Sequence, residues 1–160
     1  MRRLSVYLDT SVINFVFADD APDFQRATVD FFEHYAELYG LFISDVVLLE
    51  INRDPDIEHQ SQLLSILGEH DISVLPDDDI DEIRQLARRY IEQGIIPEAK
   101  LEDALHVAHA TVHGIDVLLS WNFRHLANVN KEAKIIAVNT EEGYRHPLRL
   151  TSPLEVLYES

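Results

Sequence analysis

The chain has 160 residues, 46% of them hydrophobic and 26% charged, which is the composition of a folded protein with one sizeable core. We therefore expect a single domain over residues 1–160. The absence of cysteine excludes disulfide frameworks, thiolate metal sites and thiol catalysis, and is consistent with a reducing cytoplasm. No apolar run reaches the roughly 18 residues of a membrane span, and no signal peptide is recognisable, so we expect a cytoplasmic protein without membrane contact.

Acidic residues dominate the charge of the chain. Lysine and arginine number 13 against 29 aspartate and glutamate residues, a formal net charge of −16. This excess argues against generic nucleic-acid binding, which depends on basic side chains. The imbalance is uneven, because residues 1–80 hold 4 basic and 17 acidic side chains while residues 81–160 hold 9 and 12. We expect any polyanion site in the later half and a basic partner on the first.

Apolar periodicity predicts strands that alternate with helices in the first half of the chain. A short apolar strand is followed by Asp9-Thr10-Ser11, a helix-capping group, and Gly40 ends the long helix that Pro22 opens. The expected strands are residues 4–8, 41–44 and 72–75, and the expected helices are residues 22–39, 45–52, 57–67 and 80–91.

The second half continues this alternation. A helix is expected at residues 97–113, ended by Gly114, with strands at residues 116–120 and 133–138 before a tail interrupted by glycine and proline. Alternating strands and helices favour a mainly parallel sheet covered on both faces. The predicted fold class is α/β.

The carboxyl ends of the strands direct attention to four polar residues, because open α/β sheets bind their ligands there. Asp9 ends the first strand, and Asn122 follows the fourth in Ser120-Trp121-Asn122. Glu50 and Asp103 lie on helices with apolar neighbours. At about 100° per residue, Asp103 falls at the edge of its helix's packed face, and Glu102 falls on a polar side that meets water.

Each of these residues also has a purely structural interpretation. Asp9 is a good helix cap, and Glu50 could be a capping or snorkelling carboxylate. Asp103 would interact with the helix dipole if its helix begins near Lys100, and Asn122 could cap a short helix at residues 123–127. Taken together, several acids among apolar neighbours would repel one another unless a cation, a proton or an arginine compensates. Oxygen ligands of this kind indicate Mg²⁺ or Mn²⁺.

Four short segments occur in a characteristic order: Tyr7-Leu8-Asp9-Thr10-Ser11-Val12, residues 44–50, residues 102–110 and Leu119-Ser120-Trp121-Asn122-Phe123-Arg124-His125-Leu126. Together they resemble the PIN-domain ribonucleases, in particular the VapC-type toxins of toxin–antitoxin pairs. The resemblance implies a PIN-like three-layer α/β/α fold with a central, mainly parallel sheet. It also implies a metal-dependent endoribonuclease that hydrolyses RNA phosphodiester bonds.

The resemblance places the metal-site acids at Asp9, Glu50 and Asp103, with Mg²⁺ (or Mn²⁺) as cofactor. The fourth position of the family's site is Asn122, so the site has three carboxylates rather than four. Ser11 or Thr10 corresponds to the hydroxyl beside the first acid, and Ser11, Arg124 and His125 are candidate contacts to RNA. The implied partners are a homodimer mate and a small basic antitoxin, for which helices at residues 23–39 and 57–67 offer an apolar and acidic groove.

Two other functions are considered. His106, His109 and His113 share the polar side of one helix and could bind zinc or nickel, although a partly solvated interface stripe is the favoured interpretation. A haloacid-dehalogenase-like phosphatase would need a second aspartate two residues after Asp9, where this chain has Ser11. The remaining alternative is a catalytically weak or inactive PIN-like module that binds RNA or protein.

Overall fold

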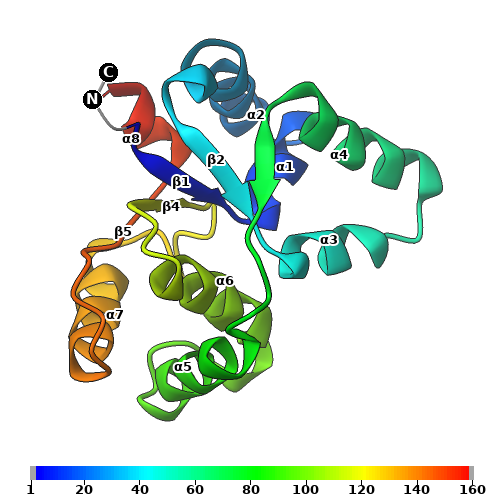
Figure 1. The fold of residues 1–160 in the computed structure, drawn as a ribbon. Helices are drawn as coiled ribbons and strands as arrows, with labels where there is room; N and C mark the ends of the chain where they lie inside the picture. Colours follow the sequence, from blue (N-terminus) through cyan, green and yellow to red (C-terminus); the bar gives the residue numbers. More distant parts are fainter. Residues whose placement is uncertain (1–2, 159–160) are drawn as a thin grey trace.

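The protein is described by a computed structural model that covers residues 3–158, in which five strands form one sheet (Figure 1). The strand order is β3-β2-β1-β4-β5, and every neighbouring pair runs parallel. The central strand pairs on both sides, since Val6 is in register with Leu41 of β2 and with Val117 of β4. The strands are β1 (Ser5–Leu8), β2 (Gly40–Ile43), β3 (Ile72–Val74), β4 (Val117–Leu119) and β5 (Arg149–Thr151).

Eight α-helices within the described residues connect and cover the strands. They are α1 (Thr10–Asn14), α2 (Pro22–Asp30), α3 (Asp45–Asn52), α4 (Ile57–Glu69), α5 (Ile80–Glu92), α6 (Leu101–Val112), α7 (Val129–Glu141) and α8 (Pro153–Tyr158). In Figure 1, α1 and α2 lie on one side of the sheet and α5, α6 and α7 on the other. The predicted three-layer α/β/α architecture is confirmed.

The topology creates a switch point between β1 and β4. The chain leaves β1 toward the α1–α2 side and leaves β4 toward the α7 side, so the two connections diverge to opposite faces. Such a divergence opens a crevice outside the carboxyl ends of the two strands. Asp9 directly follows β1, and Ser120-Trp121-Asn122 directly follows β4, so both segments lie at this crevice.

β1 occupies the centre of the sheet, and its side chains are buried on both faces. Val6, Tyr7 and Leu8 are at most 1% exposed, so side chains on both faces of the strand are covered. An apolar strand with no polar face is expected in a parallel sheet that has helices on both sides. Tyr7 differs from the other two side chains because it carries a hydroxyl group, and a buried hydroxyl needs a hydrogen-bond partner.

The strand predicted at residues 133–138 is wrong. These residues belong to α7, which begins when the Asn128 side chain accepts a hydrogen bond from the Lys131 backbone N–H at 2.8 Å. The buried residues Ile135, Val138 and Asn139 recur at spacings of three and four, which is helical periodicity rather than alternation. The last strand is instead β5, in the tail expected to be irregular, where it pairs with β4.

Three further boundaries differ from the prediction. The helix expected at residues 22–39 is α-helical only as α2, and it continues as a π-helical turn (Phe31–Tyr35) and a 3₁₀ turn (Ala36–Leu38). A second 3₁₀ turn (Glu98–Lys100) precedes α6, so that helix begins at Leu101. Residues 123–127 form a turn rather than a short helix. Gly114 ends α6 as expected, with a φ of +65° that favours glycine.

No helix among the described residues is long and apolar enough to cross a membrane.

Candidate functional site

Asp9 lies at the carboxyl end of β1 and caps α1. Its Oδ1 accepts a hydrogen bond from the Ser11 hydroxyl at 2.5 Å and from the Val12 backbone N–H at 3.3 Å. The side chain is nonetheless almost completely buried, at 3% exposed. Burial raises the pKa of Asp9, although the charge of His106 and the hydrogen bond from Ser11 oppose this shift. The capping interpretation is therefore correct but incomplete, because a cap does not need a buried carboxylate.

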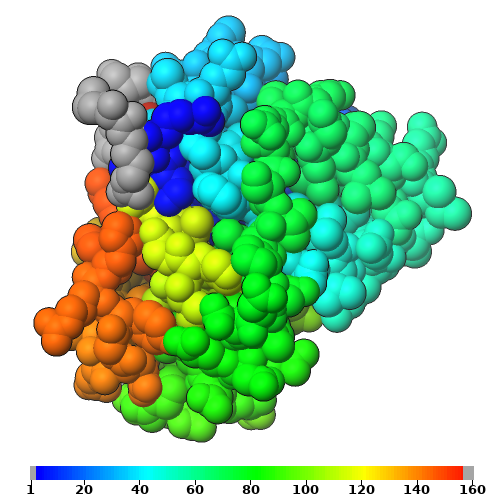
Figure 2. All heavy atoms as spheres, in the orientation of Figure 1, coloured from blue at the N-terminus to red at the C-terminus, as the bar shows by residue number. Residues whose placement is uncertain are grey.

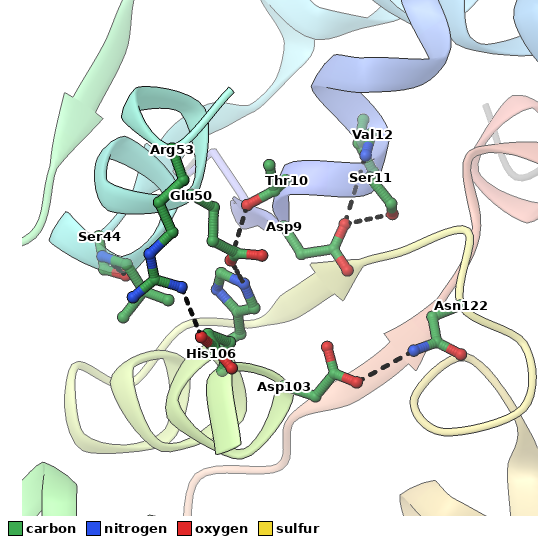
Figure 3. A network of polar contacts seen from close by, with 12 residues as sticks. Asp9, Thr10, Ser11, Val12, Ser44, Glu50, Arg53, Asp103, His106 and Asn122 are labelled. Carbon is green, nitrogen blue, oxygen red and sulfur yellow. Dashed lines mark hydrogen bonds and ion pairs between the residues drawn. The ribbon is translucent and has the colours of Figure 1, made fainter. Parts of the chain in front are cut away.

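Asp103 faces Asp9 from the first turn of α6. Burial raises the pKa of Asp103 to about 6, with the negative charges of Asp9 and Glu50 adding to the shift and the charge of His106 opposing it. Asp9 and Glu50 are thus close enough to Asp103 to disfavour its ionised form. Figure 3 shows their side chains directed toward one region beyond the ends of the strands.

Asn122 contacts Asp103 but presents its nitrogen to it. Its Nδ2 donates to Asp103 Oδ2 at 3.1 Å, while its Oδ1 accepts from the His125 backbone N–H at 3.0 Å. Both partners determine the orientation of the amide, since a flip would set the NH₂ group against a backbone N–H. Asn122 therefore acts as a donor that stabilises the ionised form of Asp103, and its amide oxygen already belongs to the turn that follows.

Glu50 reaches the site from α3 and is held through one oxygen. Its Oε1 accepts from the Thr10 hydroxyl at 2.9 Å and lies 2.7 Å from His106 Nε2. Within residues 3–158, no hydrogen bond is made to its Oε2. This arrangement fixes the direction of the carboxylate and leaves one oxygen available on its half-buried side.

His106 connects this site to the core, a place that the sequence analysis did not assign to it. Its Nδ1 lies 2.7 Å from the Tyr7 hydroxyl, which in turn lies 2.6 Å from Ser44 Oγ. Burial alone would lower the pKa of His106, but the hydrogen bond to Glu50 and the charges of Asp9, Glu50 and Asp103 outweigh it and raise the pKa. The signal was present in the sequence, because a histidine three residues after Asp103 lies on the same side of a helix.

The partly solvated histidine stripe is therefore wrong for two of its three members. His106 is 2% exposed and His109 is 1% exposed, so only His113 is partly open to solvent. Glu102, expected to meet water alone, forms an ion pair of 2.7 Å with Arg53 of the segment after α3. This ion pair joins the first turn of α6 to the end of α3.

The remaining candidate residues occupy distinct places. Ser11 donates to Asp9 and accepts from the Trp121 backbone N–H at 2.9 Å, so it joins the two segments that follow β1 and β4. Arg124 is exposed and His125 is half-buried, both in the turn beyond Asn122. Partial burial lowers the pKa of His125, and the positive charges of Arg124, Lys131 and Lys100 lower it further.

The donor set is compatible with a small divalent cation. Among residues 3–158, no group of three or more histidine, aspartate or glutamate side chains is already arranged to hold a metal ion. Mg²⁺ does not require such a cage, because it usually binds through one or two carboxylates and keeps several water molecules. Asp9 and Asp103 supply hard carboxylate oxygens with raised pKa values, and a cation would relieve the repulsion that contributes to the Asp103 shift.

The shape of the surface alone would have placed the functional site elsewhere. A hollow of about 650 Å³ lies between α5 and the end of α7, and none of its lining residues belongs to the predicted site. Two of the three arginines in its lining form ion pairs, as in the 2.8 Å contact of Arg89 with Glu142. Buried acidic groups, rather than cavity volume, distinguish the crevice at β1 and β4.

Comparison with known proteins agrees with this geometry. The model of the PIN domain family matches residues 6–132, which is most of the chain, so this protein belongs to the PIN domain family. The fold is similar to a chain in the crystal structure of VapBC2 from Rickettsia felis bound to a DNA fragment from their promoter, with a TM-score of 0.56 and 20% identity. The match covers 76% of this chain and 90% of that one. No curated protein matches the chain.

Proposed function

We propose that this chain is a Mg²⁺- or Mn²⁺-dependent endoribonuclease of the VapC type, the toxin of a toxin–antitoxin pair, in a single PIN-like domain of residues 1–160. PIN domains are generally nucleases, and such nucleases generally use divalent metal ions. The observation that carries the proposal is the convergence of three carboxyl groups at the β1–β4 switch point (Figure 3), with burial raising the pKa of Asp103 to about 6.

The proposed roles follow from which oxygens are already used. When bound, Mg²⁺ or Mn²⁺ would activate a water molecule and neutralise charge on the phosphoryl oxygens. Asp9 and Asp103 would hold the ion, and Asn122 would orient Asp103 through its 3.1 Å hydrogen bond. Glu50 would accept a proton from water at Oε2, since Thr10 and His106 hold its Oε1. Ser11 orients Asp9, and Arg124 and His125 would meet the RNA backbone.

Partner binding is proposed for the acidic first half of the chain. A hollow of about 290 Å³ between the Ala36–Leu38 turn and the end of α4 has three acidic side chains in its lining, Glu37, Glu69 and Asp71, together with Arg3 and His70. Helix α4 lies beyond β3 at one edge of the sheet (Figure 1), and its teal to green atoms project from the surface (Figure 2). Ile57, at the start of this helix, is 75% exposed. Acidic and apolar side chains together suit a basic amphipathic segment, such as that of a small antitoxin.

Two measurements test these partners. Size-exclusion chromatography should show a homodimer, and co-purification should return a small basic protein. A strict monomer that co-purifies with no such protein would contradict the proposal.

Replacement of one acid by its amide tests the proposed chemistry. Asp9→Asn keeps the volume and the capping ability of the side chain and removes only its charge. We expect the variant to fold as the wild type does and to lose cleavage of single-stranded RNA by a factor of about 10²–10³, by analogy with the loss of one transition-state contact. The measurement compares both proteins on structured and unstructured RNA with Mn²⁺ and with EDTA.

The matched control is Asp23→Asn, which makes the same change at an exposed position on α2 and should leave cleavage unchanged. Equal cleavage by the wild type and by Asp9→Asn would assign the activity to another site. No cleavage of any RNA by the wild type would favour a PIN-like binding module, an alternative that the amide at Asn122 supports because it lowers the charge available to a cation.

A further inference from the structure

Four aromatic rings pack together around Trp121, in the segment after β4 that also carries Asn122. The Phe24 and Trp121 centroids lie 4.8 Å apart, and Phe123 lies 5.9 Å from Trp121 and 6.1 Å from Phe24. Phe15 completes the cluster at 5.8 Å from Trp121. Trp121 is only 6% exposed, but Phe24 and Phe123 are 38% and 43% exposed. The cluster therefore has a buried base and leaves two aromatic rings at the surface.

Hydrogen bonds hold the buried base of this cluster in place. Trp121 Nε1 donates to Thr28 Oγ1 at 2.8 Å, and the Thr28 hydroxyl donates to the Phe24 backbone carbonyl at 2.7 Å. These bonds join helix α2 to the segment that follows β4. Exposed rings that are held from below lose little conformational freedom when a flat ligand packs on them.

The same segment carries the candidate site. The Trp121 backbone N–H donates to Ser11, which donates to Asp9, and Phe123 follows Asn122, which donates to Asp103. Phe123 thus lies on the segment whose hydrogen bonds reach both acids, and Phe24 of α2 packs on Trp121 of that segment. An apolar surface continuous with a phosphodiester site suits the bases that neighbour the reacting phosphate.

Positive charge borders these rings, in a chain whose net charge is −16. Arg124 follows Phe123, and its charge acts on His125 together with those of Lys131 and Lys100. Within residues 3–158, neither Arg124 nor Lys100 makes an ion pair. Aromatic rings beside unpaired cations complement a chain of flat bases and phosphates better than an apolar protein segment.

We propose that Phe24 and Phe123 form a stacking platform for a base of single-stranded RNA beside the scissile phosphate, with Arg124 and Lys100 contacting the adjoining phosphates. The platform rests on the proposed ribonuclease function and defines its substrate more closely. Stacking on aromatic rings requires unpaired bases and accepts any base, so the platform selects single strands rather than a sequence.

Binding in EDTA tests the platform without cleavage. The probes are a fluorescein-labelled RNA of about eight nucleotides and the same oligomer with abasic central positions. We expect the wild type to bind the intact oligomer about 5- to 150-fold more tightly than the abasic one. Phe123→Ala should lose a similar factor on the intact oligomer and none on the abasic one, and Phe123→Tyr should restore affinity. Trp121 is the only tryptophan, so its fluorescence should change with the intact oligomer alone.

The control Leu38→Ala removes another exposed apolar side chain, 56% exposed and outside the aromatic cluster, and should bind RNA as the wild type does. The platform is wrong if Phe123→Ala binds intact RNA normally, or if it changes the molecular mass in solution instead, which would identify a protein contact. Metal-dependent cleavage with an unchanged KM in Phe123→Ala would reject the platform alone. A wild type that neither binds nor cleaves RNA would reject the ribonuclease as well.

Discussion

Asn122 supplies a hydrogen bond at the position where the resemblance to PIN-domain ribonucleases led us to consider a fourth acid. Its Nδ2 donates to Asp103 at 3.1 Å, which favours the ionised carboxylate without adding negative charge. A carboxylate at this position would face Asp103 with two acceptors and no donor. The amide thus lowers the repulsion in the metal-free site, and it also lowers the attraction for a cation.

Asn122→Asp should therefore move two measured quantities in opposite directions. The metal-free variant should be less stable than the wild type by about 1–3 kcal/mol, because a donor is replaced by a like charge. Its gain in stability on adding Mg²⁺ should be larger, since a fourth carboxylate joins Asp9, Glu50 and Asp103. Thermal unfolding with EDTA and with Mg²⁺ measures both effects. A metal-free variant as stable as the wild type would show that the Asn122–Asp103 contact contributes nothing.

His109 provides a second residue whose environment has a measurable effect. It is 1% exposed, and among the residues that the structure describes its Nδ1 has no hydrogen-bond partner. Burial lowers the pKa of His109 to about 4, and the positive charges of His106 and His113 lower it further, while Asp77 opposes the shift. The unfolded chain, with a histidine pKa near 6.5, binds a proton here at a higher pH than the folded chain does.

The His109 contribution to stability is therefore present above pH ~6.5 and is lost as the pH falls toward about 4. His109→Leu, which cannot titrate, should show a shallower loss of unfolding free energy over this interval. Urea denaturation at pH 7 and near pH 4.5 measures the difference. The control is His34→Leu, at a side chain 67% exposed, whose pH dependence should follow the wild type. Parallel curves for His109→Leu and the wild type would contradict the assigned shift.

At the scale of elements, α7 shows how a cap and a short apolar run compete. The run Ile135-Ile136-Ala137-Val138 is typical of a buried strand, yet only Ile135 and Val138 are buried and Ala137 is exposed. The Asn128 side chain begins the helix seven residues earlier by accepting from the Lys131 N–H. Because the helix begins at this cap, the buried apolar residues Ile135 and Val138 lie on one side of α7 and face the core.

Asn128→Ala should destabilise the protein by about 1 kcal/mol, because it removes the acceptor for an N–H in the first turn. Urea denaturation measures this cost. Asn130→Ala provides a control in the same turn, where the side chain is exposed and a change should have little effect. If the two substitutions cost the same, Asn128 does not determine where α7 begins.

At the scale of the whole molecule, the sheet topology brings together acids that are distant in sequence. Asp9 follows β1, Glu50 lies on the helix after β2, and Asp103 lies on the helix before β4. Their side chains meet only because β1 lies between β2 and β4 in the sheet. Folding therefore holds like charges near one another in the absence of a cation. The electrostatic repulsion between these carboxylates contributes to the raised pKa of Asp103, which is about 6.

Mg²⁺ should stabilise the folded wild type at neutral pH, since it binds the assembled site and not the unfolded chain. A concentration about 100 times its Kd would add about 2.7 kcal/mol to the unfolding free energy. Asp103→Asn should gain much less, because it lacks a ligand and much of the repulsion. Thermal unfolding in MgCl₂, compared with NaCl at equal ionic strength, measures the shift. Equal gains in the two proteins would show that Asp103 is not a ligand.

The sequence by itself determined the layered parallel sheet and the placement of Asp9 and Asn122, because these depend on local patterns. A short apolar strand followed by a capping group can be recognised within a few residues, and carboxyl ends of parallel strands share one edge. The tertiary structure alone decided the role of His106, whose partners Tyr7 and Glu50 are 99 and 56 residues away. It also decided the orientation of the Asn122 amide and the identities of α7 and β5. Each of these depends on a contact made only after the chain has packed, which local periodicity does not encode.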